Sequence, residues 1–162
     1  MMNNDLLREM LRRHEGLHLF PYRCTSGKLT IGYGWNLDAH PLPLDYAACL
    51  HVTGKITEAM AEHLLTISID MAERDCRGIY PGFDRFSEAR RFALIDFLFN
   101  LGSTRALKFK KMRKAIETED WEEAANQVND SAYWRQLGGD PAGTDDGKLE
   151  RPEEIAQMLR NG

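Results

Sequence analysis

The chain has 162 residues, 43% of them hydrophobic and 28% charged, which is the balance of a compact globular protein and excludes a disordered chain. Its formal net charge of −4 argues against nucleic acid as a partner, because neutralising phosphates requires a surplus of Lys and Arg. No apolar run approaches the roughly 18 residues of a membrane span, so we expect neither a stable membrane association nor a signal peptide.

The first elements in chain order are a helix and a small sheet. Apolar residues recur at helical spacing from Leu6 to Leu11, and Gly16 follows, which predicts a short amphipathic helix that ends near His14. From Leu29 to Trp35 the apolar period changes to two, after a turn-prone sequence. This pattern predicts a β-hairpin or three-stranded sheet over residues 17–36.

Helices are predicted for most of the remaining chain. A long apolar-periodic stretch begins at Thr57 and stops at the glycines of 78–82, so a single helix there can join two lobes. The stretch from Ser87 to Gly102 is apolar nearly all round, which is typical of a central helix that gathers the core. Shorter helices are predicted over 108–117, 120–129 and 152–159, and a loop over 138–147.

A basic segment lies within this acidic chain. Six of the ten residues from Arg105 to Lys114 are Lys or Arg. The segment can be the solvated face of a helix, or it can contact an anionic polymer. Both interpretations stay open on the sequence alone.

The stretch EGLHLFPYRCTSGKLTIGYG carries the candidate chemistry. Glu15 places a carboxylate at the end of the first predicted helix, and the glycine-rich strand that follows carries the thiol of Cys24 and the hydroxyl of Thr30. Eight residues separate Glu15 from Cys24, and five separate Cys24 from Thr30. The chain has three cysteines, Cys24, Cys49 and Cys76. This small odd number argues against a disulfide framework and favours synthesis in a reducing compartment.

This pattern resembles the phage-type lysozymes, in the variant that has Cys where most members have the catalytic Asp. Their active site combines a glutamate, an aspartate or cysteine, and a threonine at these spacings. The resemblance continues in order through most of the chain, along the helix at Thr57 and the segments 90–102, 121–125 and Tyr133-Trp134.

The resemblance implies an α+β fold that is mainly helical and two-lobed, within a single lysozyme domain over 1–162. The small antiparallel sheet is expected in the N-terminal lobe (1–56). A connecting helix (57–79) then leads to a helical C-terminal lobe (80–162).

The function that the resemblance implies is that of an endolysin muramidase. Such an enzyme hydrolyses the β-1,4 bond between N-acetylmuramic acid and N-acetylglucosamine in bacterial peptidoglycan, and so lyses the host cell. We expect synthesis in the host cytoplasm, from a phage or a prophage, and access to the wall after a separate protein has permeabilised the membrane. We expect a monomer without cofactor or metal.

Each residue of the motif has an expected role. A glycosidic oxygen leaves only when protonated, and burial beside apolar groups keeps a glutamic acid protonated near neutral pH, so Glu15 is the expected general acid. The Cys24 thiol, with an ordinary pKa of about 8.5, would position a water well only if a neighbour such as Arg23 or His18 lowered that pKa. The Thr30 hydroxyl can donate to that water and accept from it. We expect an inverting hydrolysis, and a covalent thioglycoside is the alternative.

Four further residues are candidates for supporting roles. Gly32 can let the backbone approach a sugar, or can mark a bend in its strand. Phe99 and Asn100 match the family segment that lines the cleft, although their plain interpretation is a core residue and a helix-end residue. Arg151 matches an arginine that, in relatives, pairs with the catalytic glutamate.

Other functions fit parts of the sequence. A lytic transglycosylase would cleave the same bond with a hydroxyl of the sugar in place of water. A wall peptidase would use Cys24 as nucleophile, with His14, His18 or His40 as its base. A non-catalytic module that binds the wall or nucleic acid would rest on residues 105–114, but it leaves Glu15 unexplained. The pair His14 and His18 is interrupted by Gly16, which argues against a zinc helix.

Overall fold

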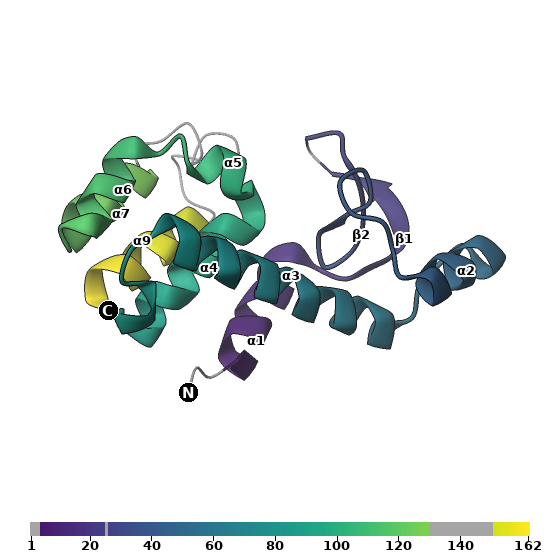
Figure 1. Ribbon diagram of the computed structural model, residues 1–162. Coiled ribbons are helices and arrows are strands. Elements are labelled where there is room, and N and C mark those ends of the chain that lie inside the picture. The colour runs from purple at the N-terminus through teal and green to yellow at the C-terminus, as the bar shows by residue number, and fades with distance from the viewer. Residues whose placement is uncertain (1–3, 25, 130–150) are drawn as a thin grey trace, which may run out of the picture. The chain divides into compact units, whose positions relative to one another are not determined.

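The computed structural model describes residues 4–24, 26–129 and 151–162, and helices dominate it (Figure 1). The predicted loop over 138–147 and the Tyr133-Trp134 pair lie outside the described residues. The chain divides into two compact units, Asn3–Met71 and Ala72–Gly162. None of the helices described is both long and apolar enough to cross a membrane.

The first unit contains α1 (Asn4–Glu15), α2 (Leu44–Thr53) and the beginning of α3 (Glu58–Ile79). The amphipathic pattern predicted α1 correctly, and Leu7, Met10 and Leu11 form its buried face. No residue of α2 is buried, and its Leu44 and Val52 side chains are 90% and 81% exposed. Without one apolar face the helix leaves no periodic signal, so the sequence did not indicate α2.

The predicted small sheet is confirmed. It consists of β1 (His18–Arg23), β2 (Leu29–Gly32) and β3 (Trp35–Asn36), antiparallel and in that order. The inward-facing residues of β2 and β3 belong to the core cluster of this unit, whose buried members are Ile31, Trp35, Ile56, Ala61 and Leu64. Trp35 is therefore a packing residue.

The second unit is organised around α4 (Glu88–Leu101). Every residue from Phe92 to Leu98 is buried, which confirms the prediction of a central helix, and the Ser87 hydroxyl caps it by accepting from the amide of Arg90. A short 3-10 turn over Phe83–Arg85 precedes α4. Within its described residues this unit also contains the end of α3 and the helices α5 (Ser103–Ala106), α6 (Lys110–Glu117), α7 (Trp121–Asn129) and α9 (Arg151–Asn161).

The helices of this unit contact one another in pairs. The helix α9 contacts both α4 and α7, and α7 also contacts α6. Asp120 caps α7, since its carboxylate accepts from the amide of Glu123 at 3.1 Å. The Glu123 carboxylate accepts from Gln127 at 2.7 Å.

Candidate active site

Glu15 is the last residue of α1, and Gly16 ends the helix. Gly16 adopts a left-handed conformation, with φ of 68°, and its amide donates to the carbonyl of Arg12 at 3.0 Å. Glycine reaches this conformation without the steric cost that a Cβ atom imposes. The half-buried Glu15 carboxylate is therefore held at the point where the helix gives way to the sheet.

An ion-pair cluster fixes α1 to α3 one turn before Glu15. Arg12 donates to both carboxylate oxygens of Glu62, each at 2.7 Å, and Arg8 donates to the same carboxylate at 2.7 Å. The hydrogen bonds from Arg12 and then Arg8 lower the pKa of Glu62 to about 2, against the opposing effect of burial. Glu62 is thus a carboxylate at any pH near neutral, and it sets the position of the helix that ends in Glu15.

The β1–β2 hairpin brings Tyr22, Cys24 and Thr30 onto one face. Tyr22 is paired with Thr30 in the register, and the amide of Cys24 continues the pairing by donating to the carbonyl of Lys28 at 3.0 Å. Side chains two residues apart on a strand point to the same side, and so do directly paired residues. The thiol and the hydroxyl predicted to act together are therefore neighbours.

The thiol of Cys24 lies in a turn that favours its ionised form. Its sulfur is 3.1 Å from the Ser26 hydroxyl, and the turn is closed by the amide of Gly27, which donates to the Cys24 carbonyl at 2.8 Å. Hydrogen bonding by the Ser26 hydroxyl is the main cause that lowers the pKa of Cys24 from 9.0 to about 7. The amides of Ser26 and Lys28 and the Thr30 side chain lower it further, while burial opposes them.

The neighbour that lowers the pKa of Cys24 most is thus Ser26, and not the Arg23 or His18 considered from the sequence. The Arg23 guanidinium donates instead to the carbonyl of Gly27 at 2.8 Å. With a pKa of about 7, roughly half of the Cys24 side chains carry a thiolate at neutral pH.

The hydroxyl of Thr30 is held in place by the backbone. Thr30 is only 4% exposed, and its hydroxyl donates to the carbonyl of Lys28 at 3.0 Å. The oxygen of this anchored hydroxyl also has lone pairs that can accept a hydrogen bond.

Tyr22 is a site residue that the sequence analysis did not single out. Its ring lies against the ring of His18, with centroids 4.0 Å apart. Burial raises the pKa of Tyr22, and the charges of Glu15 and Cys24 raise it further. The Tyr22 hydroxyl therefore remains protonated and lies within electrostatic range of both groups. The sequence did contain a signal for this residue: Tyr22 lies in a predicted strand two residues before Cys24, so its side chain is expected on the same side as the thiol.

Gly32 lies at the end of β2, where it is buried and has a φ of 65°. A Cβ atom at this position would lie 3.5 Å from the Cβ of Ala61 and 3.7 Å from a methyl of Ile56. The left-handed backbone already accounts for a glycine here. Its contact with a sugar stays a prediction.

The other predicted site residues belong to the second unit. Phe99 and Asn100 are half-buried near the end of α4, and their contact with substrate stays a prediction. Arg151, the first residue of α9, donates to the carboxylate of Asp96 at 2.6 and 3.1 Å. Asp96 is fully buried, so this ion pair lies in the core of the unit. The expected pairing of Arg151 with Glu15 stays a prediction.

Comparison with known proteins assigns the family. The model of the phage lysozyme family matches residues 12–147, which include Glu15, Cys24 and Thr30. The chain belongs to the phage lysozyme family.

Individual relatives agree with this assignment. Two probable T4-type lysozymes of Dictyostelium discoideum are each 27% identical to this chain, over 78% and 80% of its length and 84% and 85% of their own. The pre-baseplate central spike protein of Enterobacteria phage T4 is 30% identical over 84% of the chain. The chain spans only 26% of the length of that spike protein.

The geometry of the site offers two chemical capabilities. A carboxyl group that ends a helix can transfer a proton, and a thiol with a pKa of about 7 can accept one or attack as a nucleophile. Lysozymes are glycosidases, so membership of the phage lysozyme family indicates a glycosidase. The contributions of Ser26, Glu62 and Tyr22 were not predicted from the sequence, because they depend on side-chain contacts.

Proposed function

We propose that this protein is a muramidase that hydrolyses the β-1,4 bond between N-acetylmuramic acid and N-acetylglucosamine in bacterial peptidoglycan. Glu15 is the general acid, and Cys24 and Thr30 hold the attacking water. The observation that carries the proposal is the Cys24–Thr30 neighbourhood, in which a thiol with a pKa of about 7 shares a face with a backbone-anchored hydroxyl.

The proposed reaction is a single displacement. Glu15 gives its proton to the glycosidic oxygen while the bond from that oxygen to the anomeric carbon breaks. A water bonds to the anomeric carbon from the opposite face, donating one hydrogen bond to Thr30, and passes a proton to the Cys24 thiolate. Exchange with solvent then returns a proton to Glu15 and removes one from Cys24. The product is a sugar of inverted configuration.

Two features of the site support these roles. The pKa of about 7 allows Cys24 to take up a proton near neutral pH, which is the property a general base requires. The charges of Glu15 and Cys24 both raise the pKa of Tyr22, so the proposed acid and the proposed base lie near the same residue. The range matched by the family model includes these residues.

The same thiol supports one alternative within the reaction. A thiolate is a strong nucleophile, so Cys24 could attack the anomeric carbon and form a thioglycoside that water then hydrolyses with overall retention. Proton nuclear magnetic resonance of the fresh product separates the two courses. The proposal predicts the α anomer first, whereas the β anomer, together with a sugar adduct on Cys24 in the mass spectrum, would establish the covalent course.

The test of the reaction class is an analysis of the products from purified peptidoglycan in oxygen-labelled water. A muramidase produces one new reducing end per cut, and that end carries the label. A lytic transglycosylase produces an anhydro end, lighter by one water and without the label. A peptidase releases new amino groups and leaves the glycan uncut. Either of the last two results would overturn the proposal.

Biologically, we propose that the enzyme acts on the bacterial cell wall as an endolysin. Its proposed partner is peptidoglycan, and its proposed role is lysis of the host cell. A purified sample added to bacterial cells whose walls are accessible from outside should clear the suspension, and the Glu15→Gln variant should not.

A further inference from the structure

The basic segment of the sequence lies on α6 and just before it. Met112, Ala115 and Ile116 form the buried face of α6, which leaves Lys110 and Lys114 exposed on its surface. Because the whole chain carries a net charge of −4, this local excess of positive charge is a distinct feature of the second unit.

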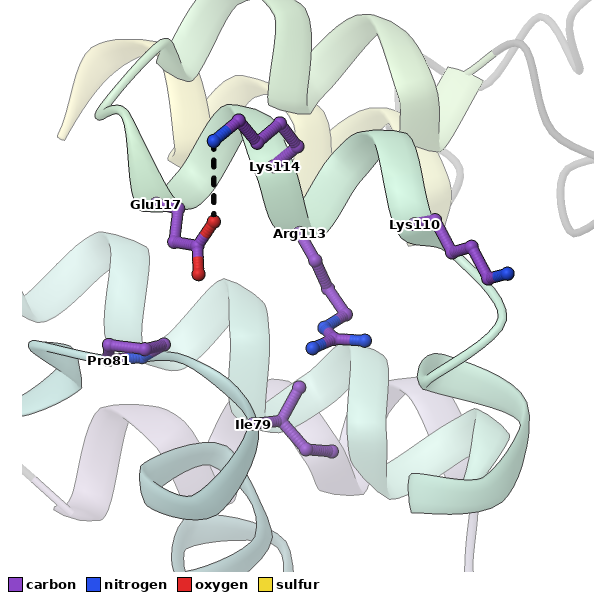
Figure 2. Close-up of a pocket in the computed structure, with 6 residues that line it drawn as sticks. All are labelled: Ile79, Pro81, Lys110, Arg113, Lys114 and Glu117. Carbon is purple, nitrogen blue, oxygen red and sulfur yellow. Dashed lines mark ion pairs between the residues drawn. The ribbon is translucent and has the colours of Figure 1, made fainter.

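A pocket opens beside this helix, between α6 and the end of α3 (Figure 2). Its volume is about 190 Å³, below the roughly 300 to 1,000 Å³ of pockets that hold whole small molecules. It therefore suits a single chemical group. The lining residues are Ile79, Pro81, Lys110, Arg113, Lys114 and Glu117.

The charges in this pocket do not balance. Lys114 and Glu117 form a loose ion pair at 3.7 Å. Among the residues that the structure describes, Lys110 and Arg113 have no acidic partner. Figure 2 shows the Arg113 side chain running from α6 into the pocket, toward Ile79. The positive charges of Lys110 and Arg113 can therefore bind an anionic ligand.

Two buried polar atoms near this pocket also lack hydrogen-bond partners within the described residues. They are Nε of Arg113 and the hydroxyl oxygen of Tyr80, whose residue is only 1% exposed. The charge of Arg113 acts on the Tyr80 hydroxyl, so the two groups are close. A buried donor without an acceptor is costly, and an oxygen-rich anion in the pocket would supply acceptors to Arg113.

We propose that the pocket formed by Ile79, Pro81 and the basic side chains of α6 binds a phosphate group. A phosphate carries up to two negative charges and several acceptor oxygens, so it can be shared by Lys110, Arg113 and Lys114 at once. A carboxylate offers two oxygens and one charge, which matches this set less well. The phosphate would belong to a phosphate-bearing polymer of the bacterial envelope, which the pocket would hold while the catalytic residues work elsewhere.

Phosphate binding does not depend on the proposed reaction, because it concerns different residues and is tested by binding, whereas the envelope polymer as the source of the phosphate rests on the proposed function. The full chain, labelled with ¹⁵N, is titrated with inorganic phosphate at constant ionic strength, and backbone amide shifts are followed. The expected dissociation constant is on the order of 1 to 10 mM, with the largest shifts in residues 110–117. The Glu15→Gln variant should bind phosphate equally well.

Matched variants localise the binding. Arg113→Gln and Lys110→Gln should each weaken phosphate binding at least about tenfold. Lys111→Gln removes the same charge from the same helix but lies outside the pocket, so it should leave binding nearly unchanged. Equal losses in Lys110→Gln and Lys111→Gln, or no saturable shifts in residues 110–117, would overturn the proposal.

Two further probes identify the ligand chemistry. Acetate at the same ionic strength should bind at least about tenfold more weakly than phosphate, and equal binding would refute the preference for phosphate. Poly(glycerol phosphate) should compete with inorganic phosphate for the pocket. If vesicles of phosphatidylglycerol compete and the soluble polymer does not, the envelope-polymer assignment is wrong.

Discussion

Arg12 and Glu62 form a bidentate ion pair, with both nitrogen–oxygen distances at 2.7 Å. Arg12 lies three residues before Glu15, the proposed general acid. Arg12 and Glu62 are 50 positions apart in the sequence and join α1 to α3. Any change in this pair should therefore reach Glu15 through the end of α1.

The first prediction concerns this pair. Glu62→Gln should lower the free energy of unfolding by about 1 kcal/mol, because the pair is partly screened by water, and should reduce activity several-fold. In the folded protein the pKa of Glu62 is depressed to about 2 from 4.5. Its contribution to stability is thus complete above pH 4.5 and is lost as the pH falls toward 2.

Thermal unfolding followed over this pH range checks the effect. The wild-type protein should lose more stability between pH 4.5 and 2 than Glu62→Gln does. Glu9→Gln removes an exposed carboxylate from the same helix and serves as the control. Parallel pH curves for wild type and Glu62→Gln would show that the pair does not stabilise α1.

The second prediction concerns Ser26, whose hydroxyl is the main cause of the low pKa of Cys24. Ser26→Ala should raise that pKa from about 7 toward 9.0, so that less thiolate exists at neutral pH. If the thiolate is the base, the rising limb of kcat/KM should move to higher pH by the same amount. The pKa of Cys24 is measured from the thiolate absorbance of a protein that also carries Cys49→Ser. The remaining thiol, Cys76, does not contribute to this absorbance, because burial raises its pKa and keeps it protonated.

An unchanged rising limb in Ser26→Ala, despite a raised thiol pKa, would mean that Cys24 does not act as a base. A thiol pKa that does not change would show instead that Ser26 is not its activating partner.

The third prediction concerns Tyr22, which we assign as a positioning residue between Glu15 and Cys24. Tyr22→Phe should lower kcat about tenfold, the cost of one lost polar contact in the transition state, and should leave KM nearly unchanged. The split between kcat and KM is the readout of positioning, and it is measured by steady-state kinetics. Tyr46→Phe removes a hydroxyl bonded to His63 and is the control. Equal kinetic parameters for the two variants would assign Tyr22 to packing alone.

The fourth prediction concerns the ion pair of Arg151 and Asp96 in the second unit. Asp96 is fully buried and the Arg151 side chain is 10% exposed. Asp96→Ala would remove the carboxylate that binds this buried guanidinium and should cost about 3 to 5 kcal/mol in the free energy of unfolding. Urea unfolding measures this loss. The double variant Asp96→Leu with Arg151→Met should recover most of it, and a double variant as unstable as the single one would contradict this account.

These contacts show how far the sequence alone could lead. Periodicity located α1, the small sheet and α4, and the predicted start of the central helix at Ser87 coincides with the residue that caps it. The helix α2 gave no signal, because Leu44 and Val52 face solvent and none of its residues is fully buried. The motif of Glu15, Cys24 and Thr30 was visible, since its members are close in sequence.

What sequence reasoning could not supply was long-range or depended on turn geometry. The partner of Arg12 is 50 residues away, and the partner of Arg151 is 55 residues away. No local pattern indicates which of many carboxylates such an arginine meets. The state of Cys24 depends on a turn that brings one hydroxyl within 3.1 Å of the sulfur, and Arg23, the nearest charge in sequence, binds a carbonyl instead.

The central claim is that Glu15 protonates the leaving oxygen of a glycosidic bond. Its most direct test is the release of new reducing ends from purified peptidoglycan by wild type, Glu15→Gln and the control Glu9→Gln, all shown to be equally folded by circular dichroism. The account predicts that Glu15→Gln loses at least about a hundredfold in rate while Glu9→Gln keeps nearly full activity. Equal release of reducing ends by Glu15→Gln and wild type would contradict it.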